Sequence, residues 1–443
     1  MTWVIKIHHM DAGKGDATLF NVRTVSMVPG ESFERTVLVD GGEAKNANHM
    51  LEWLNKTGVP SVDVVVVTHY DADHVNGIRA VMKTNDRRFH ATRIYDQGLP
   101  FDLTQLGKLR NKRNADGTKS PTVGQLPSGD ANYATYVSAI ANRETSPGSG
   151  TMTTRRRITS HVLAKVGQVG DYGAAGFKAA DSLVGTEILW DGLPAMGIPA
   201  PKMTCIAANQ YVLQPGGGTA HVPVPGLSST FQKNAMSLAF LFEFGTFRYY
   251  IGGDILGLQE SGESWDATQN KYTSSAGLAS KSIKHLVAST GQDVDVIHAS
   301  HHGSKHSSGT QFVQQLNPRL AVISCGHNNP HGHPDQPVID TFAREDVAYA
   351  LTGNSFRTDV DLHGLDSSGN QLDGECFIAG IWPPGDASPT RRGDISLRVQ
   401  DVTTSPSKFV ISFIEPDAGP NIDKVTSGYD YTHALGVTTE TFT

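Results

Sequence analysis

The sequence predicts an α/β protein, in which buried strands alternate with helices. Its clearest strand is a run of four valines at 64–67, which is continuous, β-branched and uncharged, as buried strands of parallel sheets are. A helical stretch at 46–57 precedes this run, and a second helix is predicted at 78–83. Further buried strands are predicted at 294–299, 320–324 and 348–352, after a helical stretch over 276–289. Such alternation is typical of α/β folds.

The remaining strands are predicted from alternating apolar residues bounded by turns. Strands over 3–8, 17–22 and 35–39 come first, and the last of them ends in the turn Asp40-Gly41-Gly42. An apolar hairpin is predicted at 237–251, ending in Gly252-Gly253-Asp254. Towards the C-terminus the clearest strands are 395–399 and 409–413.

Composition divides the chain. Residues 95–230 are rich in Gly, Ser, Thr and Pro, so about 85–230 is predicted to be an irregular insertion or lid within a main domain of residues 1–356. Residues 357–443 are predicted to form a β-rich C-terminal extension. The insertion carries basic clusters at 108–113 and 155–157. These clusters are either solvated surface or a guide for a polyanionic substrate.

Bulk properties describe a globular protein of 443 residues with 38% hydrophobic and 18% charged residues. No apolar stretch approaches the roughly 20 residues needed to cross a bilayer, and the N-terminus has no signal-peptide pattern, so we expect no membrane partner and a cytoplasmic location. Three widely spaced cysteines fit a reducing compartment. The net charge of −7 argues weakly against non-specific coating of nucleic acid.

The segment after the valine run carries the strongest chemical signal. His69, Asp71, Asp73 and His74 lie within six positions. Imidazole nitrogens and carboxylate oxygens are the usual ligands of zinc and similar divalent ions. A solvated polar loop is the other interpretation, but four ligand-type residues at this spacing favour a metal site.

The same design recurs, because ligand-type residues also follow other predicted strands. These residues are Asp40, Asp254, His301 and the histidines within 327–333. Ends of several strands meet at one edge of a sheet, where α/β proteins place their sites. The sequence therefore predicts one shared centre.

Taken together, these motifs resemble the metallo-β-lactamase superfamily, and more narrowly the soluble nuclease-like domain of ComEC-type competence proteins. The resemblance runs in order across residues 3–356 and leaves about 85–230 and the C-terminal part uncovered. Its motifs are Asp11-Ala12-Gly13-Lys14-Gly15-Asp16-Ala17, Asp40-Gly41-Gly42, His69-Tyr70-Asp71-Ala72-Asp73-His74, Asn234-Ala235-Met236-Ser237-Leu238, Gly252-Gly253-Asp254, His301-His302-Gly303-Ser304 and Gly332-His333-Pro334.

The resemblance implies an αββα four-layer sandwich with a two-metal site along one edge. His69 and Asp71 would hold the first metal; Asp73 and His74 would hold the second. Asp254 would bridge the two ions. The second site would be completed by His301.

Two departures from the family pattern bear on the metal. Asp71 and Asn234 stand where many members have histidine, so harder oxygen ligands make manganese a rival to zinc. Asp11 and Asp16 are expected to shape the strand turn rather than to bind metal.

The implied mechanism uses two cations about 4 Å apart, which lower the pKa of a water between them so that the resulting hydroxide attacks phosphorus or a carbonyl carbon. Asp73 would orient that water, and His333 would contact a phosphate oxygen or protonate the leaving group. His302 would fix His301 or only pack beside it, and sequence leaves open which of the pair coordinates. The predicted substrate-side residues are Asn234, His302, Ser304 and His333.

The sequence thus predicts a metal-dependent hydrolase, foremost a phosphodiesterase or nuclease acting on nucleic acid. One alternative keeps the fold and takes a small phosphodiester, such as a cyclic nucleotide or phosphorylcholine, or an ester or lactone. Another alternative is a non-catalytic metal-binding interaction module. Retention of the whole ligand set argues against that last interpretation.

Overall fold

The structure is a computed structural model of the 443-residue chain. It describes residues 2–25, 33–56, 59, 62–83, 89, 91–97, 132, 135–136, 139, 160–163, 169–170, 177–178, 183–190, 200–224, 233–326, 329–352, 360–374, 376–378, 393–402 and 407–414.

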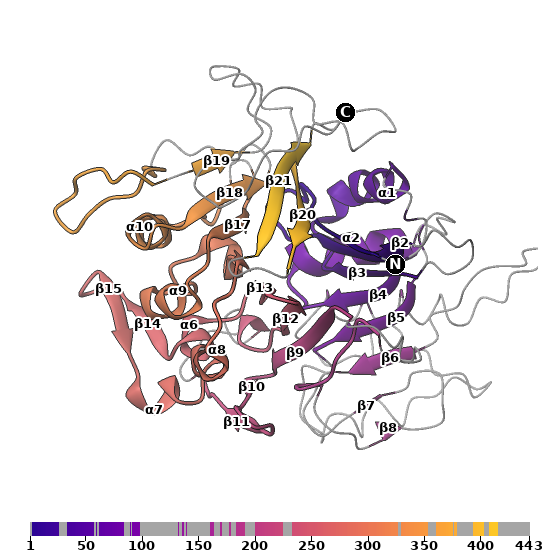
Figure 1. The fold of residues 1–443 in the computed structure, drawn as a ribbon, viewed down its shortest axis with the longest axis horizontal. Helices are drawn as coiled ribbons and strands as arrows, with labels where there is room; N and C mark the ends of the chain where they lie inside the picture. The colour runs from indigo at the N-terminus through magenta and orange to yellow at the C-terminus, as the bar shows by residue number, and fades with distance from the viewer. Residues whose placement is uncertain are drawn as a thin grey trace, which may run out of the picture.

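The first sheet is built mainly from the N-terminal part of the chain (Figure 1). Its strands are β1 (Thr2–His9), β2 (Thr18–Val25), β3 (Glu34–Val39), β4 (Val62–Val67), β5 (Ala91–Asp96), β6 (Ser160–Leu163), β20 (Asp394–Asp401) and β21 (Lys408–Ile414). Within the described residues they lie in the order β21-β20-β1-β2-β3-β4-β5-β6. The pairs from β21 to β3 are antiparallel, and those from β3 to β6 are parallel.

The second sheet is built from the middle and later parts of the chain. Its strands are β9 (Lys202–Ala208), β10 (Tyr211–Leu213), β11 (Thr219–His221), β12 (Ala239–Phe244), β13 (Phe247–Ile251), β16 (Val296–His298), β17 (Leu320–Ser324), β18 (Ala348–Thr352) and β19 (Cys376–Ile378). As far as the structure describes the chain, their order is β11-β10-β9-β12-β13-β16-β17-β18-β19. Pairing is antiparallel up to β13 and parallel from β13 onwards.

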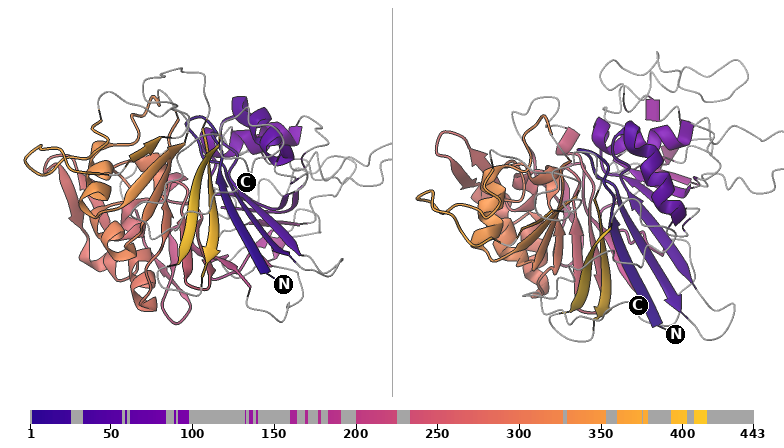
Figure 2. Two further views of the ribbon diagram at one scale, coloured as in Figure 1. Left: turned by 45° about the horizontal axis from the view of Figure 1, so that its top comes forward. Right: turned by 90° about the horizontal axis from the view of Figure 1, so that it is seen from above.

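Helices cover the outer faces of the two sheets, which face each other (Figure 2). Helices α1 (Ala47–Lys56) and α2 (Ala72–Lys83) pack on the first sheet. Helices α8 (Ile283–Thr290), α9 (Thr310–Leu316) and α10 (Gln336–Arg344) pack on the second. This is the predicted αββα sandwich. None of the helices in the described parts combines the length and apolar character needed to span a bilayer.

Shorter elements complete the described chain. They are the 3-10 helices η1 (Ala44–Asn46) and η3 (Ser300–Gly303), the helices α6 (Gly257–Glu260) and α7 (Ala276–Ala279), and the antiparallel strand pairs β7 (Val169–Gly170) with β8 (Phe177–Lys178) and β14 (Glu263–Asp266) with β15 (Lys271–Ser274).

The valine run shows how the sequence specifies the layers. Val64 and Val66 enter the core between the two sheets, whereas Val65 and Val67 enter the core between the first sheet and its helices. A strand with both faces buried needs apolar residues at every position. The prediction of a buried parallel strand is therefore confirmed.

Two helices differ from their predicted bounds. Helix α2 begins at Ala72 rather than near residue 78, so Asp73 and His74 lie in its first turn. The apolar pattern could not reveal this turn because polar residues occupy it, although an acidic residue there suits the helix dipole. The helical stretch expected over 276–289 is divided into α7 and α8 by Ser280–Ser282, with Ser282 at the N-cap of α8.

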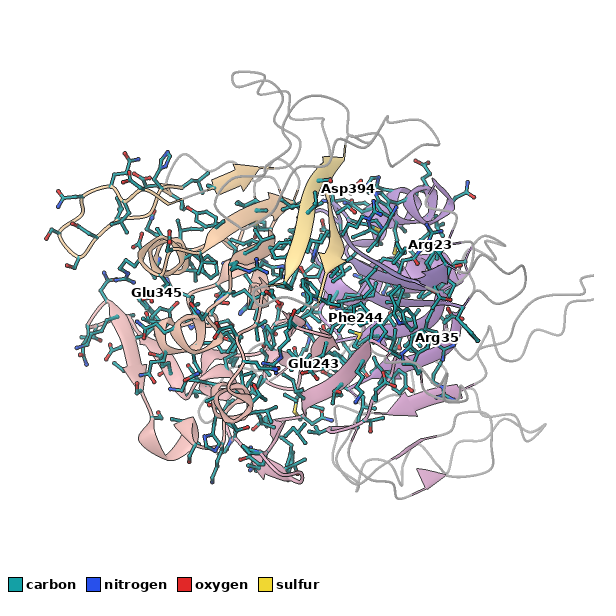
Figure 3. The ribbon with its side chains drawn as sticks, in the orientation of Figure 1. Arg23, Arg35, Glu243, Phe244, Glu345 and Asp394 are labelled. Atoms are coloured by element: carbon teal, nitrogen blue, oxygen red, sulfur yellow. The ribbon has the colours of Figure 1, made fainter. Side chains whose placement is uncertain are left out.

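The C-terminal strands belong to the sandwich. β20 pairs antiparallel with β1, which is the strand that leads into the Asp11–Asp16 turn. Asp394, labelled in Figure 3, lies at the start of β20 and is buried. Its Oδ1 accepts hydrogen bonds from the Asp11 backbone N at 2.6 Å and from His49 Nε2 at 2.9 Å. The division of the chain at residue 356 stays a prediction.

The Asp394→Ala substitution is expected to destabilise the fold by about 3 kcal/mol, because it leaves two hydrogen-bond donors without their buried acceptor. It deletes the acceptor that joins β20 to helix α1 and to the turn after β1. Urea denaturation of the variant and wild type measures the difference. A loss under about 1 kcal/mol, typical of exposed pairs, would contradict this role.

Candidate metal centre

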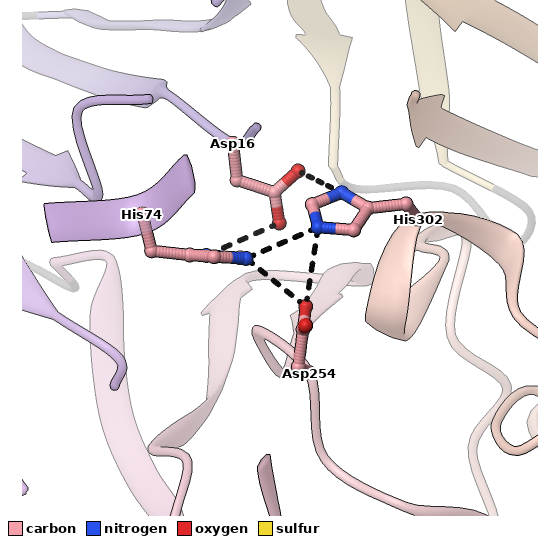
Figure 4. Close-up of side chains that lie close together, drawn as sticks. All are labelled: Asp16, His74, Asp254 and His302. Carbon is pink, nitrogen blue, oxygen red and sulfur yellow. Dashed lines mark hydrogen bonds and ion pairs between the residues drawn. The ribbon is translucent and has the colours of Figure 1, made fainter. Parts of the chain in front are cut away.

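Ends of strands from both sheets deliver ionisable side chains to one edge of the sandwich. His69 follows β4, Asp254 follows β13, and His302 lies in η3 after β16. Asp16, His74, Asp254 and His302 are buried, and each offers a ligand-type atom within 4.8 Å of those of the other three (Figure 4). Segments distant in sequence therefore form one centre, as predicted from the strand ends.

Asp254 lies at the middle of this centre, and its Oδ1 faces one group of ligands. Oδ1 is 3.1 Å from His74 Nε2 and 3.6 Å from His302 Nε2. His302 Nε2 is also 3.9 Å from Asp73 Oδ2. We call His74, His302 and Asp73, with Asp254 Oδ1, the His74 half-site.

The other oxygen of Asp254 faces a different group. Oδ2 is 3.6 Å from His69 Nε2, 3.7 Å from His301 Nε2 and 3.4 Å from Asn234 Nδ2. Asp71 Oδ2 lies 3.8 Å from His69 Nε2. We call His69, Asp71, His301 and Asn234, with Asp254 Oδ2, the His69 half-site. One carboxylate thus joins two sets of ligand-type residues.

A hydrogen-bond network orients His74 from behind. Its Nδ1 lies 2.8 Å from Asp40 Oδ2, which leaves Nε2 facing Asp254. Asp40 is itself fixed by Thr68, whose backbone N and hydroxyl donate to its two oxygens at 2.8 and 2.6 Å. Histidine ligands of metals are commonly held by a carboxylate in this way. Asp40 therefore has a structural reason to follow β3, beyond forming a turn.

Asp16 also lies behind the imidazole rings. Its Oδ1 is 3.4 Å from His302 Nδ1 and 3.6 Å from His298 Nε2, and its Oδ2 is 3.9 Å from His74 Nδ1. The nitrogens that face Asp254 are the Nε2 atoms. The Nδ1 atoms near Asp16 are held by other groups, His302 Nδ1 by the Ser324 carbonyl oxygen at 2.7 Å and His74 Nδ1 by Asp40 at 2.8 Å. Asp16 therefore adds a buried negative charge behind the rings.

Asp16 is the residue of this cluster to which sequence reasoning gave only a turn-shaping role. Asp16 belongs to the motif at 11–17, but no ligand spacing in the sequence connects Asp16 to His74 or His302. The turn is pinned to α2 by the Asp16 backbone N, which donates to Asp73 O at 3.2 Å. The only sequence signal was a carboxylate beside glycines in a strand turn.

The backbone of η3 determines how the two consecutive histidines are used. His301 and His302 have φ of 54° and 55°, in the left-handed region, and Gly303 follows at 76°. Such conformations are uncommon for residues other than glycine and concentrate at functional sites. The turn sends His302 to the His74 half-site and His301 to the His69 half-site. His302 thus lies where the resemblance placed His301, and which ring coordinates stays a prediction.

The charges of the buried groups depend strongly on one another. Burial, together with nearby His74, lowers the pKa of His69 to about 3, so this imidazole is neutral. Burial opposes ionisation of Asp254, but His74 and His302 outweigh it and hold its pKa well below the usual range. Burial likewise opposes protonation of His302, but Asp254 and Asp16 raise its pKa to about 9. Protons on His302 and His74 therefore balance the carboxylates in the metal-free protein.

Metal binding is expected to strengthen as the pH rises towards about 9, because a cation must displace the proton that Asp254 and Asp16 stabilise on His302. Below that pKa the affinity should rise at least about tenfold per pH unit. Calorimetric titrations at pH 6.5 and 8.5 in buffers of different ionisation enthalpy measure both affinity and proton release. An affinity independent of pH, without proton release, would contradict this charge balance.

The donor set fits divalent cations. His69 Nε2 is buried without a hydrogen-bond partner among the described residues, and its nearest carboxylate oxygens lie 3.6 and 3.8 Å away. A buried neutral imidazole facing carboxylates across such distances is suited to a cation between them. Asp71 adds an oxygen donor to the His69 half-site, and oxygen favours manganese relative to zinc. Asn234 instead turns its amide nitrogen Nδ2 towards Asp254 and His301, so the expected oxygen ligand at this position is not presented to the half-site.

The remaining predicted residues lie around this centre. The His333 ring centroid is 5.4 Å from that of His301, and His333 Nδ1 is 3.5 Å from Asp335 Oδ2. Ser304 is buried, and its hydroxyl accepts a hydrogen bond from the His306 backbone N at 3.4 Å. The substrate roles of His333 and Ser304 stay predictions. His327 and the basic clusters at 108–113 and 155–157, including Arg110, Lys112 and Arg113, lie outside the described residues.

Comparison with known proteins matches this chain to a family model and to a solved structure. The family model described as "Metallo-beta-lactamase superfamily" matches residues 31–99, which contain β3, α1, β4 and the histidine–aspartate motif. The chain has the metallo-β-lactamase fold. A solved structure described as "Crystal Structure of a New Diphosphatase from the PhnP Family" is also similar, with 10% identity and a TM-score of 0.28 over 72% of this chain and 85% of that one.

Two curated proteins confirm the narrower resemblance of this metallo-β-lactamase-fold chain. ComE operon protein 3 of Bacillus subtilis (strain 168) is 33% identical over 132 residues, which is 30% of this chain. Recombination protein 2 of Haemophilus influenzae is 31% identical over 86 residues, which is 19% of this chain. The aligned segments span only 14% and 11% of these two relatives. The likeness to ComEC-type proteins therefore concerns one part of much longer chains.

Proposed function

We propose that this metal-dependent hydrolase is a phosphodiesterase whose substrate is nucleic acid. The observation that supports it is the position of Asp254, whose two oxygens face separate groups of imidazole and carboxylate donors. Two divalent cations bound in such a site supply an activated water and neutralise charge that develops on a phosphoryl group. The His69 and His74 half-sites would each hold one of them.

The protein's own residues would do the rest of the work. Asp73 is the partly exposed carboxylate of the His74 half-site, with 15% of its side chain accessible, and it would orient a water and accept its proton. His333 stands beside His301, and its pairing with Asp335 would fix the ring for proton donation to the leaving oxygen. Asp40 would keep His74 aimed at Asp254, and the Ser324 carbonyl oxygen, 2.7 Å from His302 Nδ1, would do the same for His302.

Nucleic acid is favoured over a small phosphodiester by the resemblance to competence proteins and by a relative named for recombination. The small-substrate alternative is favoured by the net charge of −7, because an acidic protein repels a polyanion at long range.

A metal-supplemented screen tests the proposal. Single-stranded DNA, duplex DNA, RNA, cyclic dinucleotides and bis-p-nitrophenyl phosphate would be incubated with wild type and with Asp73→Ala, each with manganese or zinc. We expect wild type to cleave nucleic acid and the folded variant to be inactive. Full activity in excess chelator, or in Asp73→Ala, would refute the two-metal mechanism. Cleavage of cyclic dinucleotides alone would favour the small-substrate alternative.

A further inference from the structure

Two lysines stand on the exposed side of the metal centre, one beside each half-site. Lys14 Nζ is 3.8 Å from Asp73 Oδ2, and Lys233 Nζ is 3.2 Å from Asp71 Oδ1. These two carboxylates have side chains 15% and 19% accessible, against 5% for Asp254. The lysine side chains are 25% and 28% accessible. Each half-site therefore meets solvent at a carboxylate that is accompanied by an ammonium group.

Lys14 is placed there by a tightly packed turn between β1 and β2. A Cβ added to Gly15 would lie 1.7 Å from the backbone oxygen of Asp73, so this position accepts only glycine. A Cβ added to Gly326 would lie 2.6 Å from the Lys14 backbone N, so a second segment closes on the turn. The turn is thus held against the first turn of α2, and the backbone of Lys14 has little freedom to move away.

An imidazole ring accompanies Lys14. Lys14 Nζ donates to His331 Nε2 at 3.5 Å, and the His331 ring is stacked 6.1 Å from the ring of His333. The hydrogen bond holds the ammonium group on this flank of the site. An ammonium group suits phosphate oxygens, which accept charge-assisted hydrogen bonds.

The two lysines come from different parts of the sandwich. Lys14 follows β1 of the first sheet, whereas Lys233 precedes β12 of the second. Lys14 lies beside the His74 half-site, which contains Asp254 Oδ1, and Lys233 lies beside the His69 half-site, which contains Asp254 Oδ2. A phosphodiester centred over Asp254 would therefore have one lysine on each side.

We propose that Lys14 and Lys233 bind the two phosphates that flank the scissile phosphodiester, which makes the preferred substrate a strand with three consecutive phosphates. This inference rests on the proposed phosphodiesterase function. Partly exposed ion pairs contribute little to stability, so stabilisation alone is a weak reason for a lysine at both open carboxylates. Carboxylates that hold a divalent cation have less charge left for a lysine, and each ammonium then becomes available to an anion.

A set of thymidine dinucleotides tests this directly. TpT has only the scissile phosphodiester, pTpT and TpTp add one flanking phosphate, and pTpTp adds both. Wild type should show a higher kcat/KM for pTpTp than for TpT. Lys14→Gln should lose about tenfold more kcat/KM on one of the two singly extended substrates than on TpT, and Lys233→Gln about tenfold more on the other than on TpT. Lys271→Gln, an exposed lysine in β15, is the matched control.

The outcomes separate this inference from the function on which it rests. Equal losses on TpT and pTpTp, or a fall in bound metal measured by mass spectrometry, would show that the lysines serve the cations or the scissile phosphate and would overturn it. Cleavage of TpT by wild type without preference for flanking phosphates would overturn it as well. Failure to cleave any phosphodiester, including bis-p-nitrophenyl phosphate, would instead overturn the proposed function and this inference with it.

Discussion

Replacing Asp254 with asparagine is expected to lower kcat/KM for phosphodiester cleavage by well over a hundredfold, since changes in groups that merely support metal ligands already cost about 10–100-fold. The substitution keeps the size of the side chain but removes the negative charge of Asp254, whose Oδ1 faces His74 and whose Oδ2 faces His69. Both half-sites should therefore lose affinity for metal together. Steady-state kinetics and metal content after dialysis measure the two effects.

The control for this variant is Asp346→Asn, an exposed aspartate in the left-handed region that asparagine also tolerates. It should retain wild-type activity and metal content. An Asp254→Asn protein that folds, keeps two bound metals and cleaves its substrate normally would show that Asp254 does not join the half-sites.

Replacing His302 with alanine is expected to remove one bound cation and to reduce kcat/KM by at least about a hundredfold. His302 Nε2 faces both Asp254 and Asp73, whereas His301 Nε2 faces Asp254 and Asn234. His301→Ala should therefore weaken the His69 half-site and spare the His74 half-site. Metal titrations of the two variants at several pH values measure the affinity of each remaining site and so distinguish the two half-sites.

In His302→Ala the pH dependence should weaken to the part set by His74, whose pKa is also raised. In His301→Ala it should persist in full, because burial, together with His333 and His302, outweighs Asp254 and already lowers the pKa of His301 to about 4. Loss of the pH-dependent site in His301→Ala, with His302→Ala unaffected, would reverse the assignment.

Much of the fold could be predicted because local sequence and global packing agree. Val64 to Val67 are apolar at every position since β4 is covered on both faces. The ligand-type residues at the ends of β4, β13 and β16 stand out because polar groups seldom follow buried strands without a role. Convergence of Asp254 and the two histidine motifs followed from that rule.

What sequence could not give is long-range geometry. Asp16, His74 and His302 meet only after β1, α2 and η3 are packed together, and no spacing in the chain records that distance. The choice between His301 and His302 depends on two left-handed backbone positions, which the residue types do not announce. The sequence predicts the strands near residues 395 and 410, but the pairing of β20 with β1 rests on contacts distant in sequence.

Anomalous diffraction from crystals soaked in manganese tests the central claim most directly. Two peaks are expected, one on each side of Asp254: one contacting His69 and the other contacting His74 and His302, as the two sets of distances imply. A single peak, or peaks that leave either oxygen of Asp254 without a cation, would contradict the account.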